Sequence, residues 1–321
     1  MTTYKAIKGL SIQTVAGDPS VLAVGDIWYN SSLTKIRVAK TTAAAWASGG
    51  NMTTGRGDGA PASGAPSTAA QIMAGENPRT GKTEQYDGSS WTEVGDMGSG
   101  RNSARGAGTQ TAALAFGGTP SPSNPVGLSE EWNGTSWAEG NDLNTHRYMG
   151  QGCGTQTAGL GSGGYQAAPA VANVPTMTEE YNGTSWAEGG TLNAAKNTGQ
   201  GFGIQTAAIV TGPSDTPTTE QYDGSSWTEI ADLNNARHNV AAGGIVTIGL
   251  VMGGPGGHTE LWDGSAWTET SNMSSGRAPN YGSSGGSNTA GYVCGGPAAA
   301  PGNATEEFTG ESTDAATVTS S

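Results

Sequence analysis

One eleven-residue pattern occurs five times along this chain of 321 residues. Each copy carries an aromatic residue, then Asp-Gly or Asn-Gly, then Trp five positions after the aromatic, as in TEQYDGSSWTE from Thr83. Such a turn between short alternating segments favours a β-hairpin. A repeat of fixed period determines an architecture whatever the composition, so this pattern constrains the fold more than any other feature. The other copies begin at Ser129, Thr178, Thr219 and Thr259.

Each copy belongs to a longer unit of four short strands, which we name a to d in chain order. Strand b ends near Gly-Gly, strand c carries the aromatic residue and strand d carries the Trp. The steps between repeated Trp residues, 40 to 49 residues, are those of a propeller blade. The repeated Trp residues are Trp46, Trp91, Trp137, Trp186, Trp227 and Trp267. A basic residue follows each Trp by ten positions and precedes strand a: Arg56, Arg101, Arg147, Lys196, Arg237 and Arg277.

The two ends of the repeat complement each other. Trp46 lies on a strand d that lacks a strand c before it, and the last unit stops after Phe308 without a strand d. We therefore predict an all-β fold, a six-bladed β-propeller over residues 41–310 that is closed by the N-terminal strand and so has no exposed sheet edges. Residues 1–40 would form a short β-hairpin segment, and we expect the Ser/Thr-rich tail, residues 311–321, to be disordered unless a partner orders it.

Two resemblances follow from these residues. The order basic residue, double Gly, Tyr and Trp resembles the kelch repeat, which implies a kelch-like propeller. The stretch DPSVLAVGDIWYNSSLTKIRV resembles the N-terminal β-hairpin segment of virion structural proteins of tailed phages. Together they imply a non-enzymatic virion protein, assembled in the host cytoplasm, whose residues 1–40 attach to other virion proteins or to copies of the chain. The propeller would be displayed on the tail or a fibre as an adhesin for a host surface glycan or protein.

Composition excludes several other classes of protein. The 54 Gly and 15 Pro residues disfavour long helices, and no apolar run reaches the length of a signal peptide or a membrane span. The net charge of −13, with no basic run, argues against binding to nucleic acid or to an anionic membrane. We expect Cys153 and Cys294 to be free thiols, since neither lies in a metal-binding pattern.

The b–c loops vary in length, which either reflects length drift alone or marks a contact surface on the face of the b–c loops and d–a linkers. The residues we place there are Asn124, Tyr165, Gln166, Asn173, Arg101 and Arg147. The repeated basic residues could surround the channel mouth and hold an anion. We favour a second interpretation, in which they bridge adjacent blades by donating to backbone carbonyls.

The repeat also creates a conflict between carboxylates. If Tyr86 lies opposite Trp91, then Glu84 lies opposite Glu93, and the same holds in the other four copies. Like charges directly opposite each other are destabilising. A register shifted by a two-residue turn, neutralisation by a nearby Arg, or a bound cation such as calcium would each resolve the conflict, and we favour the first two.

Motifs for catalysis are lacking. The sequence has three His residues and neither a Gly-x-Ser-x-Gly elbow nor an HExxH motif, so we predict no enzymatic activity, no cofactor and no metal. The alternatives to a tail or fibre adhesin are a capsid decoration protein, an intracellular kelch-type scaffold that binds peptides and, least favoured, an enzyme like the copper oxidases.

Overall fold

The computed structural model describes residues 12–62, 64, 67–75, 79–120, 124–166, 176–211, 216–274, 282–296 and 302–319, with the backbone alone at 282–286. The chain forms two compact units. Unit 1 is Met1–Ala44 with Gly310–Ser321, and unit 2 is Ala45–Thr309. The tail thus belongs with the N-terminal segment rather than standing as a third part.

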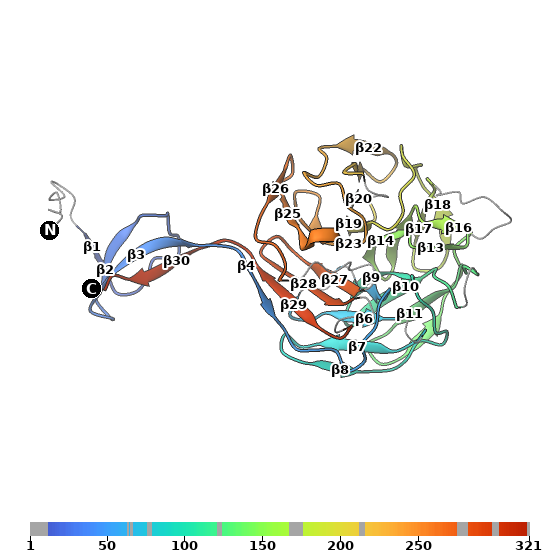
Figure 1. The fold of residues 1–321 in the computed structure, drawn as a ribbon, viewed down its shortest axis with the longest axis horizontal. Coiled ribbons are helices and arrows are strands. Elements are labelled where there is room, and N and C mark those ends of the chain that lie inside the picture. The colour runs from blue at the N-terminus through green and yellow to red at the C-terminus, as the bar shows by residue number, and fades with distance from the viewer. Residues whose placement is uncertain are drawn as a thin grey trace. The chain divides into compact units, whose positions relative to one another are not determined.

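Unit 2 is a β-propeller, as the repeat predicted. Its four-stranded sheets surround a common centre (Figure 1). The first three sheets are β5 (Ala60–Pro61), β6 (Gln71–Met73), β7 (Thr83–Tyr86) and β8 (Trp91–Glu93); β9 (Arg105–Thr109), β10 (Ala112–Phe116), β11 (Ser129–Trp132) and β12 (Trp137–Glu139); and β14 (Gln151–Thr155), β15 (Ala158–Ser162), β17 (Thr178–Tyr181) and β18 (Trp186–Glu188).

Three further sheets have the same form. They are β19 (Gln200–Ile204), β20 (Ala207–Thr211), β21 (Thr219–Tyr222) and β22 (Trp227–Ile230); β23 (Val240–Ile245), β24 (Ile248–Gly253), β25 (Thr259–Trp262) and β26 (Trp267–Glu269); and β27 (Gly282–Gly286), β28 (Ala290–Gly295), β29 (Thr305–Thr309) and β4 (Ala45–Ser48). In the last sheet Phe308 lies opposite Trp46. A two-stranded sheet, β13 (Arg147–Tyr148) with β16 (Tyr165–Gln166), and a 3-10 turn, η1 (Pro255–Gly257), complete unit 2 as described.

The repeated Trp residues tie neighbouring sheets together. Each indole Nε1 donates a hydrogen bond to a residue of a neighbouring sheet or, for Trp267, to the residue that follows one, so burial of the indole leaves no donor unpaired. The pairs are Trp91 to Thr305 (2.9 Å), Trp137 to Thr83 (2.9 Å), Trp186 to Ser129 (3.0 Å), Trp227 to Thr178 (2.9 Å), Trp46 to Thr259 (3.1 Å) and Trp267 to the Ala231 carbonyl (3.0 Å).

The hairpin between strands c and d has a four-residue turn. Tyr86 lies opposite Trp91, and their rings stack with centroids 4.9 Å apart. The Asp87 carboxylate accepts the amides of Ser89 (2.8 Å) and Ser90 (2.7 Å), which closes the turn. Hydrogen bonds from the Ser90 amide, then from Ser89, lower the pKa of Asp87 to about 2. The two-residue turn with a shifted register, one of the two solutions that we favoured for the carboxylate conflict, is therefore wrong.

Glycine permits the close approach of the inner strands. A Cβ at Gly106 would lie 2.1 Å from the Pro61 carbonyl oxygen, and one at Gly152 would lie 3.0 Å from that of Gly106. Side chains longer than hydrogen do not fit between strands at this separation. The high Gly content therefore belongs to a packed interior, in which buried aromatic residues supply much of the apolar area.

Unit 1 is one four-stranded sheet made from both ends of the chain. Its order is β1 (Gln13–Val15), β2 (Ile27–Asn30), β3 (Lys35–Thr42) and β30 (Ser312–Thr317). β2 and β3 form an antiparallel hairpin, β1 joins β2 in parallel, and β30 joins β3 in antiparallel pairing. The tail that we expected to be disordered without a partner is ordered by β3 of the same chain.

Candidate functional site

The repeated basic residues are buried in ion pairs with the Glu of strand c. Arg56 pairs with Glu84, and the same pairing recurs in the next four sheets: Arg101 with Glu130 (2.5 Å), Arg147 with Glu179 (2.6 Å), Lys196 with Glu220 (3.4 Å) and Arg237 with Glu260 (2.8 Å). All five basic side chains are at most 2% exposed. They cannot hold an anion at the channel mouth, and Arg277 lies outside the described residues.

The sequence interpretation that we favoured for these residues needs a correction. Arg147 does donate to the carbonyls of Gly163 (3.1 Å) and Met177 (3.1 Å), but its shortest contact, at 2.6 Å, is with the Glu179 carboxylate on β17, which is strand c of the same blade. Desolvation lowers the pKa of Arg147, and Glu179 opposes that shift. The basic residue therefore fixes the linker before strand a to strand c of its own blade, more than it bridges two blades.

The same Glu also organises the d–a linker. Its carboxylate accepts a linker amide in every blade for which the contact is described. These donors are Thr53 to Glu84 (2.7 Å), Gly98 to Glu130 (2.6 Å), Asn144 to Glu179 (2.7 Å), Asn193 to Glu220 (2.8 Å), Asn234 to Glu260 (2.7 Å) and Ser274 to Glu306 (2.9 Å). A buried carboxylate with a cation and two or more donors has its charge compensated.

The expected opposition of carboxylates is real. Glu84 lies opposite Glu93 in the ladder, but Glu84 is buried against Arg56, whereas Glu93 is exposed and pairs with Lys82 at 2.6 Å. Neutralisation by Arg, one of our favoured solutions, is thus the one the structure uses. The described residues contain no group of three His, Cys, Asp or Glu side chains placed to bind a metal.

The predicted contact surface is only partly assembled. Tyr165 and Gln166 form β16 and are half-buried, with the Tyr165 ring centroid 5.4 Å from that of Tyr148. Burial and Tyr148 raise the pKa of Tyr165, and a hydrogen bond with Asn197 opposes this. Asn124 is exposed, and Asn173 lies outside the described residues. Arg101 and Arg147 do not belong to the predicted contact surface, because their side chains are buried.

A hollow of about 650 Å³ that the sequence analysis missed lies where the a–b turns meet. Because strands are antiparallel, these turns lie at the end of the blades opposite the b–c loops. Four successive blades contribute a glycine with positive φ at the second-last position of strand a: Gly108, Gly154, Gly203 and Gly244. A Cβ at Gly108 would lie 2.1 Å from the Ala112 carbonyl oxygen, so the wall at this level is backbone.

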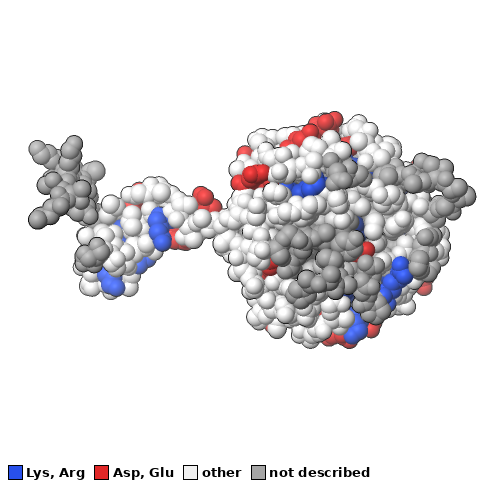
Figure 2. All heavy atoms as spheres, viewed as in Figure 1, with Lys and Arg blue, Asp and Glu red and all other residues white. Residues whose placement is uncertain are grey.

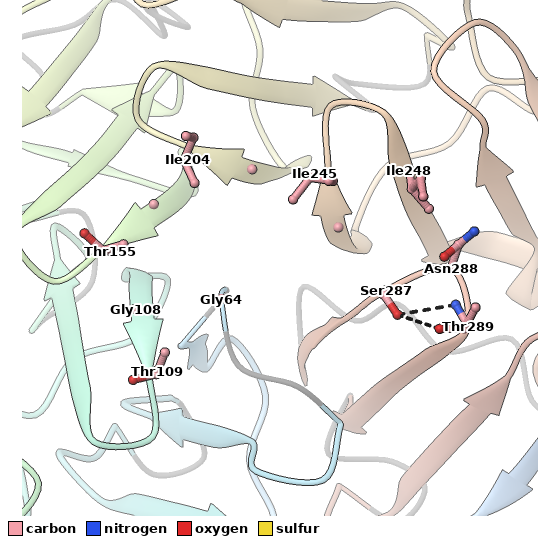
Figure 3. A pocket seen from close by; sticks show the side chains of 13 residues that line it. Gly64, Gly108, Thr109, Thr155, Ile204, Ile245, Ile248, Ser287, Asn288 and Thr289 are labelled. Atoms are coloured by element: carbon pink, nitrogen blue, oxygen red, sulfur yellow. Dashed lines mark hydrogen bonds between the residues drawn. The ribbon is translucent and has the colours of Figure 1, made fainter.

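The side chains around this hollow differ along its circumference (Figure 3). Ile204, Ile245 and Ile248 occupy one arc, and Thr109 and Thr155 occupy another. The remaining arc carries Ser287, Asn288 and Thr289, in which the Ser287 and Thr289 hydroxyls are 3.1 Å apart. The described lining contains no charged residue. The sequence does contain an indication of this site, because Ile occupies repeat positions that hold Thr or Ala in other units.

Charged side chains are sparse on the face of unit 2 that Figure 2 shows. Figure 2 shows a largely uncharged face with scattered acidic and basic side chains.

Both cysteines are free and buried, and burial raises the pKa of the Cys153 thiol to about 12. In the part of the chain that is described, no helix has the length and apolar character needed to cross a bilayer.

These features define the class of protein, a β-propeller with a separate sheet built from both chain ends. A solved structure entitled "Structure of YjhT" is similar to this chain, with a TM-score of 0.63 and 13% sequence identity. The match covers 83% of this chain and 96% of that one, and at this identity it supports the fold alone. No protein-family model and no curated protein matches the sequence.

Proposed function

We propose that this chain is a non-enzymatic structural protein of a tailed-phage particle, in which unit 1 attaches the chain and unit 2 is displayed as a kelch-like recognition module on the tail or a fibre. The observation that carries the proposal is the set of contacts around Asp18. Its carboxylate accepts hydrogen bonds from Trp28 Nε1 (3.0 Å) and Asn30 Nδ2 (2.9 Å) and pairs with Arg37 (2.9 Å).

These four residues belong to the stretch that resembles the N-terminal segment of virion proteins. The residues that carry the resemblance therefore also hold unit 1 together, and the described residues from Gln13 to Lys40 contribute three strands of its sheet. The hydrogen bond from Asn30, followed by Trp28 and Arg37, lowers the pKa of Asp18 against the opposing effect of desolvation. Asp18 is thus ionised at neutral pH and holds Arg37 as its counter-charge.

The exposed apolar side chains support attachment through unit 1. Of the ten large apolar residues exposed in the described chain, seven lie in this small unit, with Val21 84% and Val24 63% exposed. Apolar groups gathered on one small unit are typical of a surface that is covered in an assembly. The seven are Ile12, Val21, Val24, Ile27, Leu33, Ile36 and Val318. Other virion proteins, or further copies of this chain, would cover them.

We also propose that the sheets of unit 2 are the six blades of one closed ring, completed by β4. Two contacts support closure: Phe308 lies opposite Trp46, and Trp91 of the first sheet donates to Thr305 of the last. On the displayed ring, Tyr165, Gln166 and Asn124 remain candidates for contact with a host surface glycan or protein. The net charge of −13 supports such a partner over nucleic acid.

The test is mass spectrometry of purified particles from a phage that encodes the chain. We expect the chain in wild-type particles and its loss from particles that carry Asp18→Asn, because Arg37 then loses its counter-charge. Asp314→Asn, an exposed change in the same unit, is the control and should be incorporated normally. Wild-type particles without the chain, or normal incorporation of the Asp18→Asn chain, would overturn the proposal.

A further inference from the structure

We propose that the hollow formed by the a–b turns binds an uncharged small molecule that combines a branched or cyclic hydrocarbon group with hydroxyl or amide groups. The proposal concerns the end of the propeller opposite the b–c loops. It does not depend on attachment to a particle, because it rests on the side chains of unit 2 alone.

The first argument is a departure from the repeat. The last residue of strand a is Thr in the second and third sheets, at Thr109 and Thr155, but Ile in the next two, at Ile204 and Ile245. The first residue of strand b changes in the fifth sheet, where Ile248 replaces the Ala found at Ala112, Ala158 and Ala207. The scaffold accepts Thr and Ala at these positions, so folding does not require Ile there.

The second argument is exposure. Ile204 is 51% exposed, Ile245 is 54% exposed and Ile248 is 42% exposed. Among the described residues of unit 2, these three are the large apolar side chains that are exposed. All three line the same hollow, on two adjacent sheets. An apolar cluster at a concave surface is the usual form of a ligand site, and it gains free energy when a ligand replaces the water over it.

The third argument is the chemistry of the rest of the wall. The rest of the described lining carries the hydroxyls of Thr109, Thr155, Ser287 and Thr289 and the amide of Asn288, and each of these groups can donate and accept hydrogen bonds (Figure 3). The described lining offers no charge to pair with an ion, and the chain as a whole is acidic. A ligand with one hydrocarbon side and one hydrogen-bonding side therefore fits better than an ionised one.

The size of the hollow also fits. Ligand sites in proteins have volumes of roughly 300 to 1,000 Å³, and this one has about 650 Å³. Gly203 and Gly244 leave no room for a side chain, since a Cβ there would lie 2.3 Å and 2.4 Å from the carbonyl oxygens of Ala207 and Ile248. The wall at these two positions is therefore backbone, which has no side-chain rotamers to order when a ligand binds, and this reduces the entropy cost of binding.

The experiment is a titration of the full chain, with its Ile methyl groups labelled for NMR, by cyclohexanol. We expect saturable shifts at Ile204, Ile245 and Ile248, in roughly the millimolar range for so small a probe. Buried Ile72 and Ile209 should stay unchanged, since neither is exposed. Cyclohexanecarboxylate, similar in shape but charged, should bind at least tenfold more weakly.

The variant Ile204→Thr, Ile245→Thr, Ile248→Ala restores the residues of the other repeats, and it should weaken cyclohexanol binding by at least about tenfold. Ile27→Thr, an exposed change in unit 1, is the matched control and should bind as the wild type does. If the triple variant unfolds, Ile245→Thr alone serves the same purpose. The proposal is overturned by an absence of shifts up to the solubility of the probe, by shifts of equal affinity at Ile27 and Ile36, by unchanged binding in the variant, or by equal binding of the carboxylate.

Discussion

Trp46 and Phe308 stand opposite each other in the ladder of β4 and β29, with ring centroids 5.3 Å apart. The Trp46 indole also donates to the Ser271 carbonyl at 2.9 Å, next to the preceding sheet. One side chain from near the N-terminus thus joins two sheets from the C-terminal part of unit 2. Replacing Trp46 therefore tests the pairing of β4 with β29.

We expect Trp46→Ala to destabilise unit 2 by about 3–5 kcal/mol, because the change removes a half-buried aromatic ring, its contact with Phe308 and its hydrogen bonds. The free energy of unfolding by urea, followed through the remaining Trp residues, measures the loss. Ala47→Thr, an exposed change on the same strand, should alter stability by less than about 0.5 kcal/mol. Equal stability of the Trp46→Ala protein would contradict a structural role for the pairing.

The ion pairs give a second prediction. Glu179 and Glu188 lie opposite each other, but Glu179 is buried against Arg147 and Glu188 is exposed. Removing one partner of a buried pair leaves an uncompensated charge, so Glu179→Gln should cost about 3 kcal/mol. Glu188→Gln should cost less than about 0.5 kcal/mol. The two changes are chemically identical, so the difference between the two proteins in thermal unfolding measures the effect of burial. Similar losses of stability would refute the buried ion pair of Glu179 with Arg147.

The sequence predicted the strands because the information is local and repeated. Tyr86, Asp87, Gly88 and Trp91 determine a hairpin by themselves, and five copies at a blade-like spacing then determine a propeller. The partner of each basic residue was harder to assign. Arg147 and Glu179 are 32 positions apart, and their contact depends on how the d–a linker folds over strand c. The sequence left neutralisation by Arg as one of several solutions.

Two features escaped sequence reasoning for different reasons. The tail residues Ser312–Thr317 have little apolar character, so their composition indicated disorder, yet their backbone groups complete a ladder with β3. Strand pairing depends on backbone hydrogen bonds, which composition does not report. The hollow was missed because loop-length variation drew attention to the b–c face, whereas the informative change was Ile204 and Ile245 in place of Thr.

The turn aspartates predict a pH dependence. Hydrogen bonds from Ser90 and Ser89 lower the pKa of Asp87 to about 2, below an unfolded value of about 3.9. A group whose pKa is lower in the folded state adds stability above its unfolded pKa, and this contribution disappears as the pH falls through about 2. Carboxyl NMR titration should therefore give a midpoint near 2 for Asp87, and likewise for Asp223.

The chain provides its own control for that titration. Asn133 and Asn182 occupy the same turn position and accept the same amides at 2.9 Å without a charge. Asp87→Asn should keep the fold and remove the contribution of this turn to the change in stability between about pH 4 and 2. An Asp87 midpoint near 3.9 in the folded protein would rule out the contacts between its carboxylate and the turn amides.

The two cysteine thiols should be unreactive in the folded protein. Cys153 is 1% exposed and burial raises its pKa to about 12, so almost no thiolate exists at pH 8. We expect neither Cys153 nor Cys294 to react with a thiol reagent until urea unfolds the chain, after which both should react. Ser89→Cys, which places a thiol on an exposed turn, is the positive control. Rapid labelling of Cys153 in the native protein would contradict its burial.

The final prediction concerns the contribution of the tail to unit 1. β3 pairs with β30 from Arg37 opposite Thr317 to Thr42 opposite Ser312, and Arg37 also donates to the Ala315 carbonyl at 2.7 Å. A chain that ends at Gly310 leaves the β3 amides facing β30 without partners, so their hydrogen exchange should accelerate at least tenfold, while exchange in unit 2 stays unchanged. Val318→Thr, an exposed change beyond β30, should leave the protection of β3 intact. If β3 remains protected in the shortened chain, the tail is not what orders that edge of the sheet.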